Sequence, residues 1–230
     1  MEKRPKKTST HTLRWATGCL KLALIAVLSL PGLVATGYIP RHYKTTERTL
    51  TLAHAIERPR PRELVKIFSI VQANRPDLLE KEAWDLAEVI LAESSKYKLD
   101  PILILAVIDV ESKFQFGAVS PAGARGIMQI MPSTGKFLVE SVRALAKEIN
   151  VEQFMPEHLD DPIVNIKLGT YYLHDLRKSF RNVNNALIAY NLGPTELRIR
   201  MENQIEYNGE YANAVFTAYQ KFKKIKLPTL

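Results

Sequence analysis

Apolar residues recur at helical spacing through most of the chain after residue 62, and no stretch of strictly alternating apolar and polar residues stands out. A period near 3.6 residues predicts amphipathic helices. Asp100-Pro101 and Asp161-Pro162 are typical helix starts, with Asp as the N-cap and Pro in the first position. Helices are expected over 62–72, 77–97, 101–112, 132–149, 162–180, 184–191 and 209–224. The pattern therefore predicts an all-α domain with little or no sheet, apart from a minor hairpin that it would not reveal.

The N-terminal part has a different pattern. Residues 22–39 carry no charge and follow a basic segment, an order typical of an N-terminal targeting signal. Two interpretations stay open. One is an uncleaved anchor with its basic end in the cytoplasm. The other is a cleaved signal peptide with small residues at Ala35-Thr36-Gly37. The lack of an A-x-A site favours the anchor, whereas Pro31-Gly32 weakens that preference; residues after about 40 are expected outside the cytoplasm in both cases.

These patterns predict the domain organisation. A polar stretch with three prolines, before the first helix, is expected to be a linker. The expected segments are a basic cytoplasmic region over 1–14, a signal anchor or signal peptide over 15–39, a linker over 40–61, a lead-in helix over 62–76 and the main domain over 77–226.

Most of the formal net charge of +8 belongs to the N-terminal region. Residues 1–44 hold eight Lys and Arg against Glu2, which leaves 24 basic and 23 acidic residues in 45–230. A nearly neutral body gives little support to nucleic-acid binding. The single cysteine, Cys19, excludes an internal disulfide and precedes the apolar run, where a lipoprotein cysteine would follow it. The five histidines lack the spacing of metal ligands.

The first candidate for chemistry is Glu111. The helix over 101–112 is apolar around nearly its whole circumference, which predicts burial, and Glu111 lies in its last turn. Partial burial and the negative end of the helix dipole both disfavour the charged carboxylate, so we expect a raised pKa. A carboxylic acid that is protonated near neutral pH can serve as a general acid. On this stretch alone, a solvated glutamate at a helix end remains an alternative.

The segment after this helix, residues 114–134, has the composition of a long ordered loop. Gly117, Gly123 and Gly126, together with Pro121, predict tight turns, and the small residues allow a polymer to approach the backbone closely. Ser120 and Gln129 offer uncharged hydrogen-bonding groups that suit sugars, and Met128 and Met131 offer adaptable apolar contact. No acidic residue follows Glu111 until residue 140, so the loop supplies no second carboxylate.

Four motifs in order resemble the catalytic domain of the soluble lytic murein transglycosylases, a lysozyme-like family. The first joins Glu111-Ser112 and Phe114 to a run from Ser120 to Thr134, and it corresponds to E-S, an aromatic residue, and S-x-x-G-A-x-G-[LI]-M-Q-[IL]-M-P-x-T. The other three motifs are N-x-x-x-G-x-x-Y-L, A-x-x-A-Y-N-x-G and Y-x-x-x-V. They are matched by Asn165, Gly169, Tyr172 and Leu173, then Ala186, Ala189, Tyr190, Asn191 and Gly193, then Tyr211 and Val215. The resemblance covers about residues 77–225.

The resemblance implies roles for particular residues. Glu111 matches the single catalytic acid and base. Ser120, Gln129 and Met131 match residues that line the neighbouring sugar subsite. Tyr190 matches a tyrosine whose hydroxyl group lies near the glutamate, and Asn191 supports that wall.

The implied reaction is cleavage of the β-1,4 bond after N-acetylmuramic acid in the glycan strands of peptidoglycan. It leaves 1,6-anhydro ends and needs no metal or cofactor. An anchor over 15–39 would place such an enzyme in the bacterial cell envelope, on the periplasmic side of the inner membrane. If residues 1–37 are cleaved instead, the enzyme would be secreted to the periplasm.

Two positions depart from the family pattern, and two other functions remain open. Leu192 stands where alanine is usual. Tyr207 stands where some members have an acidic residue that contacts the stem peptide. One alternative is a lysozyme-type hydrolase with a second acid such as Asp160 or Asp161, because a retaining hydrolase needs two carboxylates. The other is a membrane-anchored peptidoglycan-binding scaffold with vestigial activity.

Overall fold

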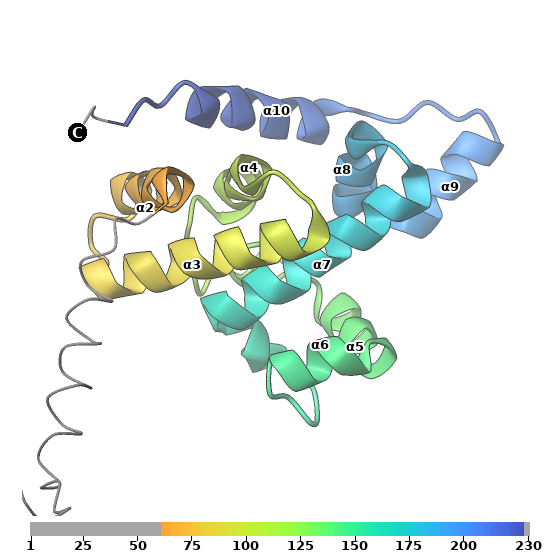
Figure 1. The fold of residues 1–230 in the computed structure, drawn as a ribbon. Coiled ribbons are helices and arrows are strands. Elements are labelled where there is room, and N and C mark those ends of the chain that lie inside the picture. Colours follow the sequence, from red (N-terminus) through yellow and green to blue (C-terminus); the bar gives the residue numbers. More distant parts are fainter. Residues whose placement is uncertain (1–60, 228–230) are drawn as a thin grey trace, which may run out of the picture. The chain divides into compact units, whose positions relative to one another are not determined.

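The structure is a computed structural model that describes residues 61–227. Within this range it consists of helices joined by loops, without a strand (Figure 1). The elements are α2 Arg62–Asn74, α3 Glu80–Tyr97, α4 Pro101–Ser112, α5 Pro132–Ser141, α6 Arg143–Glu148, the 3-10 helix η1 Pro156–Asp160, α7 Pro162–Phe180, α8 Val183–Leu192, α9 Pro194–Glu202 and α10 Glu210–Lys223. The basic region, the membrane segment over 15–39 and nearly all of the linker lie outside the described residues. Of the helices described, none combines the length and apolar character that a membrane crossing needs.

Helix α4 is the buried centre of the domain. Every residue from Pro101 to Asp109 is buried, as its all-round apolar sequence predicted. The Asp100 carboxylate accepts a hydrogen bond from the Ile102 amide at 2.8 Å, so the predicted cap is confirmed. Helices α2, α3 and α10 pack around α4 (Figure 1). The position of Glu111, at the end of α4, is therefore fixed by the packing of α4 against these three helices.

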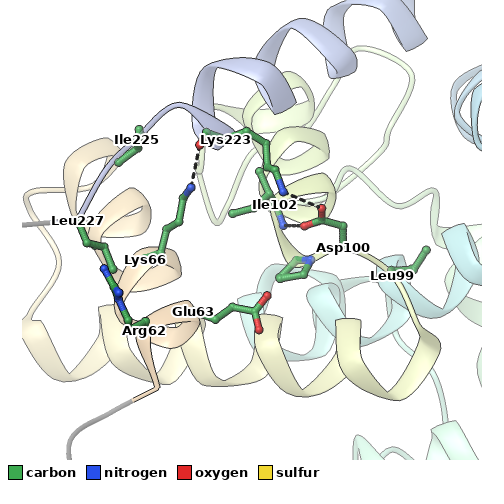
Figure 2. A pocket seen from close by; sticks show the side chains of 10 residues that line it. Arg62, Glu63, Lys66, Leu99, Asp100, Ile102, Lys223, Ile225 and Leu227 are labelled. Atoms are coloured by element: carbon green, nitrogen blue, oxygen red, sulfur yellow. Dashed lines mark hydrogen bonds and ion pairs between the residues drawn. The ribbon is translucent and has the colours of Figure 1, made fainter.

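Helix α10 is tied to the N-terminal end of α4. The Tyr219 hydroxyl donates to Asp100 Oδ2 at 2.7 Å, and Lys223 Nζ lies 3.6 Å from the same oxygen. Lys66 Nζ of α2 donates to the Lys223 carbonyl at 3.0 Å, so the three helices meet beside a hollow of about 590 Å³ (Figure 2). This hollow lies at the opposite end of α4 from Glu111.

A second group of helices supports the other side of the molecule. Helix α7 packs against α3, α8 and η1, while α5 and α6 lie on the side of α7 away from α10 (Figure 1). The Asp161 carboxylate caps α7 by accepting hydrogen bonds from the Ile163 and Val164 amides at 2.8 and 3.2 Å. The predicted start of this helix is confirmed.

The structure corrects the predicted helix over 132–149. It is broken at Val142, which has φ −118° and ψ 81°, so that α5 ends at Ser141 and α6 begins at Arg143. Ser and β-branched Val have modest helix propensity, and the apolar period across them did not reveal the break.

Two helical elements were not predicted, and the loop contains a trace of β structure. Gly193, with φ 95°, ends α8, and Pro194 then occupies the first position of α9. The 3-10 helix η1 has only five residues, which is too short for a repeat of apolar residues to be recognised in the sequence. In the loop, Arg125 forms isolated antiparallel bridges with Val119 and Ile130, and this is the only hairpin-like feature of the described range.

Candidate active site

Glu111 lies where α4 meets the start of α10. It is partly buried in the last turn of α4, and its Oε1 accepts a hydrogen bond of 2.5 Å from the hydroxyl group of Tyr211, the second residue of α10. Since Tyr219 contacts Asp100 at the other end, α10 runs antiparallel to α4 along its length. This packing brings together two residues that are 100 positions apart in the sequence.

The environment of Glu111 favours its protonated form. Burial raises the pKa of Glu111 to about 7, and the hydrogen bond from Tyr211 acts in the opposite direction. Among the described residues, no other carboxylate contributes to this shift. A group with this pKa can give up a proton and take one back near neutral pH, as a single acid and base must.

Two tyrosines stay protonated beside this carboxyl group. Burial raises the pKa of Tyr211 and of Tyr190 well above the ordinary value, and the charge of Glu111 adds to both shifts. Tyr190 donates its hydroxyl hydrogen bond to the Met128 carbonyl oxygen at 2.9 Å. Tyr211 is thus the tyrosine that hydrogen-bonds to Glu111, while Tyr190 lies close enough for the charge of Glu111 to raise its pKa, and the role that the resemblance implies for Tyr190 stays a prediction. The weak Y-x-x-x-V motif was the only sequence signal for Tyr211.

The loop after α4 is folded back on the helix. Ser112 Oγ donates to the Ile127 carbonyl at 2.7 Å, and the Gly126 amide donates to the Ala118 carbonyl at 2.9 Å. The Ser120 hydroxyl oxygen accepts from the Ala124 amide at 3.0 Å and so closes a turn. In the structure, Ser120 thus has a contact that stabilises the loop itself.

Asn165 of α7 fastens this loop to the rest of the domain. Its Nδ2 donates to the carbonyl oxygens of Arg125 and Leu159 at 2.9 and 2.8 Å, and its Oδ1 accepts from the Met128 amide at 2.8 Å. A Cβ atom at Gly126 would lie 2.1 Å from both Asn165 Nδ2 and the Leu159 carbonyl oxygen. The glycine at position 126 of the motif thus has a physical reason, since only glycine allows this close approach.

A small pocket brings together four of the five predicted sugar-binding residues. It has a volume of about 170 Å³, and Gln129, Met131, Tyr190 and Asn191 are among its lining residues. Gln129 Nε2 donates to the carbonyl oxygens of Ala118 and Gly126, both at 2.9 Å, so its Oε1 is the atom that would accept from a ligand. Ser120 is not part of this lining. Glu111 does not line this pocket, but Tyr190, which does, lies close enough to Glu111 for the charge of the carboxylate to raise its pKa.

Sequence comparison matches residues 88–214 to the family described as the transglycosylase SLT domain. The chain belongs to this family. Membrane-bound lytic murein transglycosylase C of Photorhabdus laumondii is 33% identical over 135 residues, which is 55% of this chain and 36% of that protein. Membrane-bound lytic murein transglycosylase E of Buchnera aphidicola is 35% identical over 100 residues, or 43% of this chain and 42% of that protein. The aligned part thus spans about two fifths of the length of these relatives.

Solved structures of SLT proteins share the fold of the described domain. The 70 kDa soluble lytic transglycosylase of Escherichia coli aligns with a TM-score of 0.50 at 23% identity, over 70% of this chain and 29% of that one. A complex of the 70 kDa soluble lytic transglycosylase with bulgecin A gives a TM-score of 0.51 at 22% identity, over 71% of this chain and 30% of that one. The predicted all-α, lysozyme-like fold class is confirmed for the described residues.

The two departures from the SLT pattern have visible consequences. Leu192 lines the small pocket and remains 36% exposed, so it adds apolar surface where alanine would leave space. Tyr207 is partly buried and packs against the core. The position that carries an acid in some members is therefore occupied here by an aromatic side chain.

Proposed function

We propose that the protein is a lytic transglycosylase that cleaves the β-1,4 bond between N-acetylmuramic acid and N-acetylglucosamine in peptidoglycan. The observation that carries the proposal is Glu111 itself, a partly buried carboxyl group with a pKa of about 7 inside an SLT domain. The names of the relatives, which are murein transglycosylases, supply the substrate class.

In the proposed reaction, Glu111 acts twice. Its proton passes to the oxygen of the glycosidic bond as that bond breaks, and the N-acetyl group of the substrate stabilises the developing sugar cation. The Glu111 carboxylate then removes the proton of the 6-hydroxyl group, whose oxygen closes the 1,6-anhydro ring. Tyr211 holds the carboxyl group in place through its hydrogen bond. Gln129, Met131, Tyr190 and Asn191 would contact the adjoining sugar, with Ser120 shaping the loop.

The contacts of Asp160 and Asp161 support this proposal over a two-carboxylate hydrolase. Asp160 forms a double hydrogen bond with the Arg125 guanidinium group at 3.0 and 2.5 Å. Asp161 caps α7. Each of these carboxylates thus has a structural partner, and neither is among the groups that shift the pKa of Glu111.

The location of the protein belongs to the same proposal. The charge-free run over 22–39 and the basic residues before it support an anchor or signal over 15–39. The relatives named above are membrane-bound. An inner-membrane anchor would hold the domain on the periplasmic side, whereas cleavage of the signal would release it there.

A zymogram with peptidoglycan in the gel tests the function. We expect the wild-type chain to clear the gel and the Glu111→Gln variant to leave it intact, because the amide has a similar volume but no acidic proton. Asp109→Asn is the matched control on the same helix, since Asp109 is paired with Lys113 at 3.3 Å, and it should retain lysis. Lysis by Glu111→Gln would contradict the proposal. So would full function of that variant in cells, which a scaffold predicts.

A further inference from the structure

The two residues that follow the helix of Glu111 have an unusual backbone. Lys113 and Phe114 both have positive φ, 53° and 64°, although neither is glycine. The left-handed conformation is disfavoured for such residues and persists where neighbouring contacts impose it. The Phe114 side chain is only 1% exposed and meets Phe222 edge-on, with ring centroids 6.3 Å apart. Phe114 of the strained pair is thus enclosed in the core, whereas the Lys113 side chain is exposed.

Arg75 contacts this segment from the turn between α2 and α3. Its Nη1 donates to the Phe114 carbonyl oxygen at 2.7 Å, and its guanidinium carbon lies 4.4 Å from the centroid of the Phe116 ring. The other edge of the guanidinium group is fixed by Asp77, which accepts from Nε and Nη2 at 2.8 and 2.7 Å. The side chain of Arg75 is 13% exposed and its hydrogen bond to Phe114 is partly buried, whereas Asp77 on the outer edge is 63% exposed.

We propose that Arg75 is a positioning residue for Glu111, because it fixes the left-handed Lys113–Phe114 segment that ends α4. This inference rests on the proposed function and adds a residue from outside the matched SLT region, residues 88–214. In this proposal, the lead-in helix α2 has the role of placing Arg75 beside the loop. A planar guanidinium group can serve Asp77, Phe114 and Phe116 at the same time, whereas a lysine ammonium cannot.

Loss of Arg75 has a defined chemical consequence. If the segment relaxes, the last turn of α4 loosens and water reaches the Glu111 carboxyl group. Burial is the main reason for the raised pKa of Glu111, so that pKa should fall towards its ordinary value. Less of the acid form would then be present at neutral pH. The small pocket should keep its shape, since Asn165 holds the Met128 end of the loop independently.

The test compares Arg75→Gln and the milder Arg75→Lys with Arg177→Gln in the full chain. Arg177 is a matched control, because it donates to the carbonyl oxygens of Lys98 and Tyr97 at 2.7 and 3.0 Å, and Lys98 is likewise a left-handed residue at a helix end. We expect both Arg75 variants to lower kcat on soluble peptidoglycan fragments by roughly 10-fold or more, with KM little changed. The alkaline limb of their pH–rate profile should move to lower pH, and that of Arg177→Gln should stay in place.

An NMR titration of the Glu111 carboxyl group in the same variants separates this inference from the proposed function, because it needs no activity. A lowered pKa of Glu111 in Arg75→Gln, but not in Arg177→Gln, supports the positioning role even if no glycan is cleaved. An unchanged Glu111 titration in both Arg75 variants would overturn it, as would equal shifts in the Arg177 variant. A wild-type chain that leaves peptidoglycan intact would overturn the proposed function alone.

Discussion

Tyr211 and Tyr190 have different roles beside Glu111, although both belong to the same site, with Tyr190 buried and Tyr211 partly buried. Tyr211 donates its hydroxyl hydrogen bond to the carboxyl group, while Tyr190 donates to the Met128 carbonyl oxygen and packs on Tyr172 with ring centroids 5.4 Å apart. Tyr211 therefore acts on the charge state of Glu111. Tyr190 acts on the shape of the loop and of the pocket.

The Tyr211→Phe variant should show this difference in the pH dependence of the reaction. In the wild type, activity should decline as the pH rises through about 7, because the first step needs protonated Glu111. The Tyr211 hydrogen bond lowers the pKa of Glu111, so its loss should move that decline to higher pH. The carboxyl group also loses its orientation, and kcat should fall roughly 10-fold. A pH–rate profile that moves to lower pH, as expected for the Arg75 variants, would contradict this role.

At the scale of the elements, the site depends on how closely the loop packs against α7. A Cβ atom at Gly126 would collide with Asn165 and Leu159, and one at Gly169 would lie 2.6 Å from Met128 Sδ. Two glycines from separate motifs thus allow the loop and helix to touch. The hydrogen bonds of Asn165 then fix the register between them.

Gly126→Ala should be more destabilising than Gly123→Ala, although both positions have positive φ, 79° and 87°. The left-handed backbone costs about 1–2 kcal/mol for alanine at each site. Gly126 adds the collision with Asn165 and Leu159, whereas nothing lies within 4 Å of a Cβ atom at Gly123. We expect an extra loss of roughly 1–3 kcal/mol for Gly126→Ala in chemical denaturation. Equal losses in the two variants would show that the close packing contributes little.

The elements also show what the sequence could and could not predict. Helix starts such as Asp100-Pro101 can be predicted because capping and the effect of proline depend only on neighbouring residues. The burial of α4 can be predicted because apolar residues cover nearly its whole circumference. The sequence does not reveal the break at Val142, because the apolar period continues across it. It does not reveal helix α9 either, because Gly193-Pro194 has the composition of a helix end and also starts the next helix. The pairing of Tyr211 with Glu111 depends on tertiary packing across 100 residues, which no local pattern reveals.

At the scale of the whole molecule, a second carboxyl group with an unusual pKa joins three helices. Glu93 of α3 is 3% exposed, and its Oε2 lies 3.6 Å from Lys96 Nζ. Glu148 of α6 bonds to Lys96 and lies 3.7 Å from Lys167 Nζ of α7. Burial, followed by the hydrogen bond and charge of Glu148, raises the pKa of Glu93 to about 7. This cluster ties α6 to the central helices.

The stability of the protein should therefore depend on pH through Glu93. Its folded pKa of about 7 exceeds the ordinary value of 4.5, so the folded state holds an extra proton between these values. Stability should fall as the pH rises through this window, by on the order of 3 kcal/mol from Glu93. Denaturation at pH 5 and pH 7.5 should show a smaller loss in Glu93→Gln than in the wild type. The exposed Glu152→Gln serves as the control, and a wild-type-like loss in Glu93→Gln would contradict the assignment.

The distribution of charge along the whole chain bears on the proposed anchor. The described domain is nearly neutral, and the net charge is concentrated in residues 1–44. Contact with the anionic inner surface of a membrane would thus be made by the N-terminal residues and not by the catalytic domain. Under the proposed function, the SLT domain would face the glycan strands without a strong electrostatic field of its own.

The most direct test of the central claim is the mass of the glycan ends produced from purified peptidoglycan. If Glu111 acts alone, first as acid and then as base, the wild-type chain should release fragments with 1,6-anhydro ends, each lighter by one water molecule than a hydrolysed end. The Glu111→Gln variant should release none. Fragments with only hydrolysed reducing ends would contradict the account, since a second group would then have to activate water.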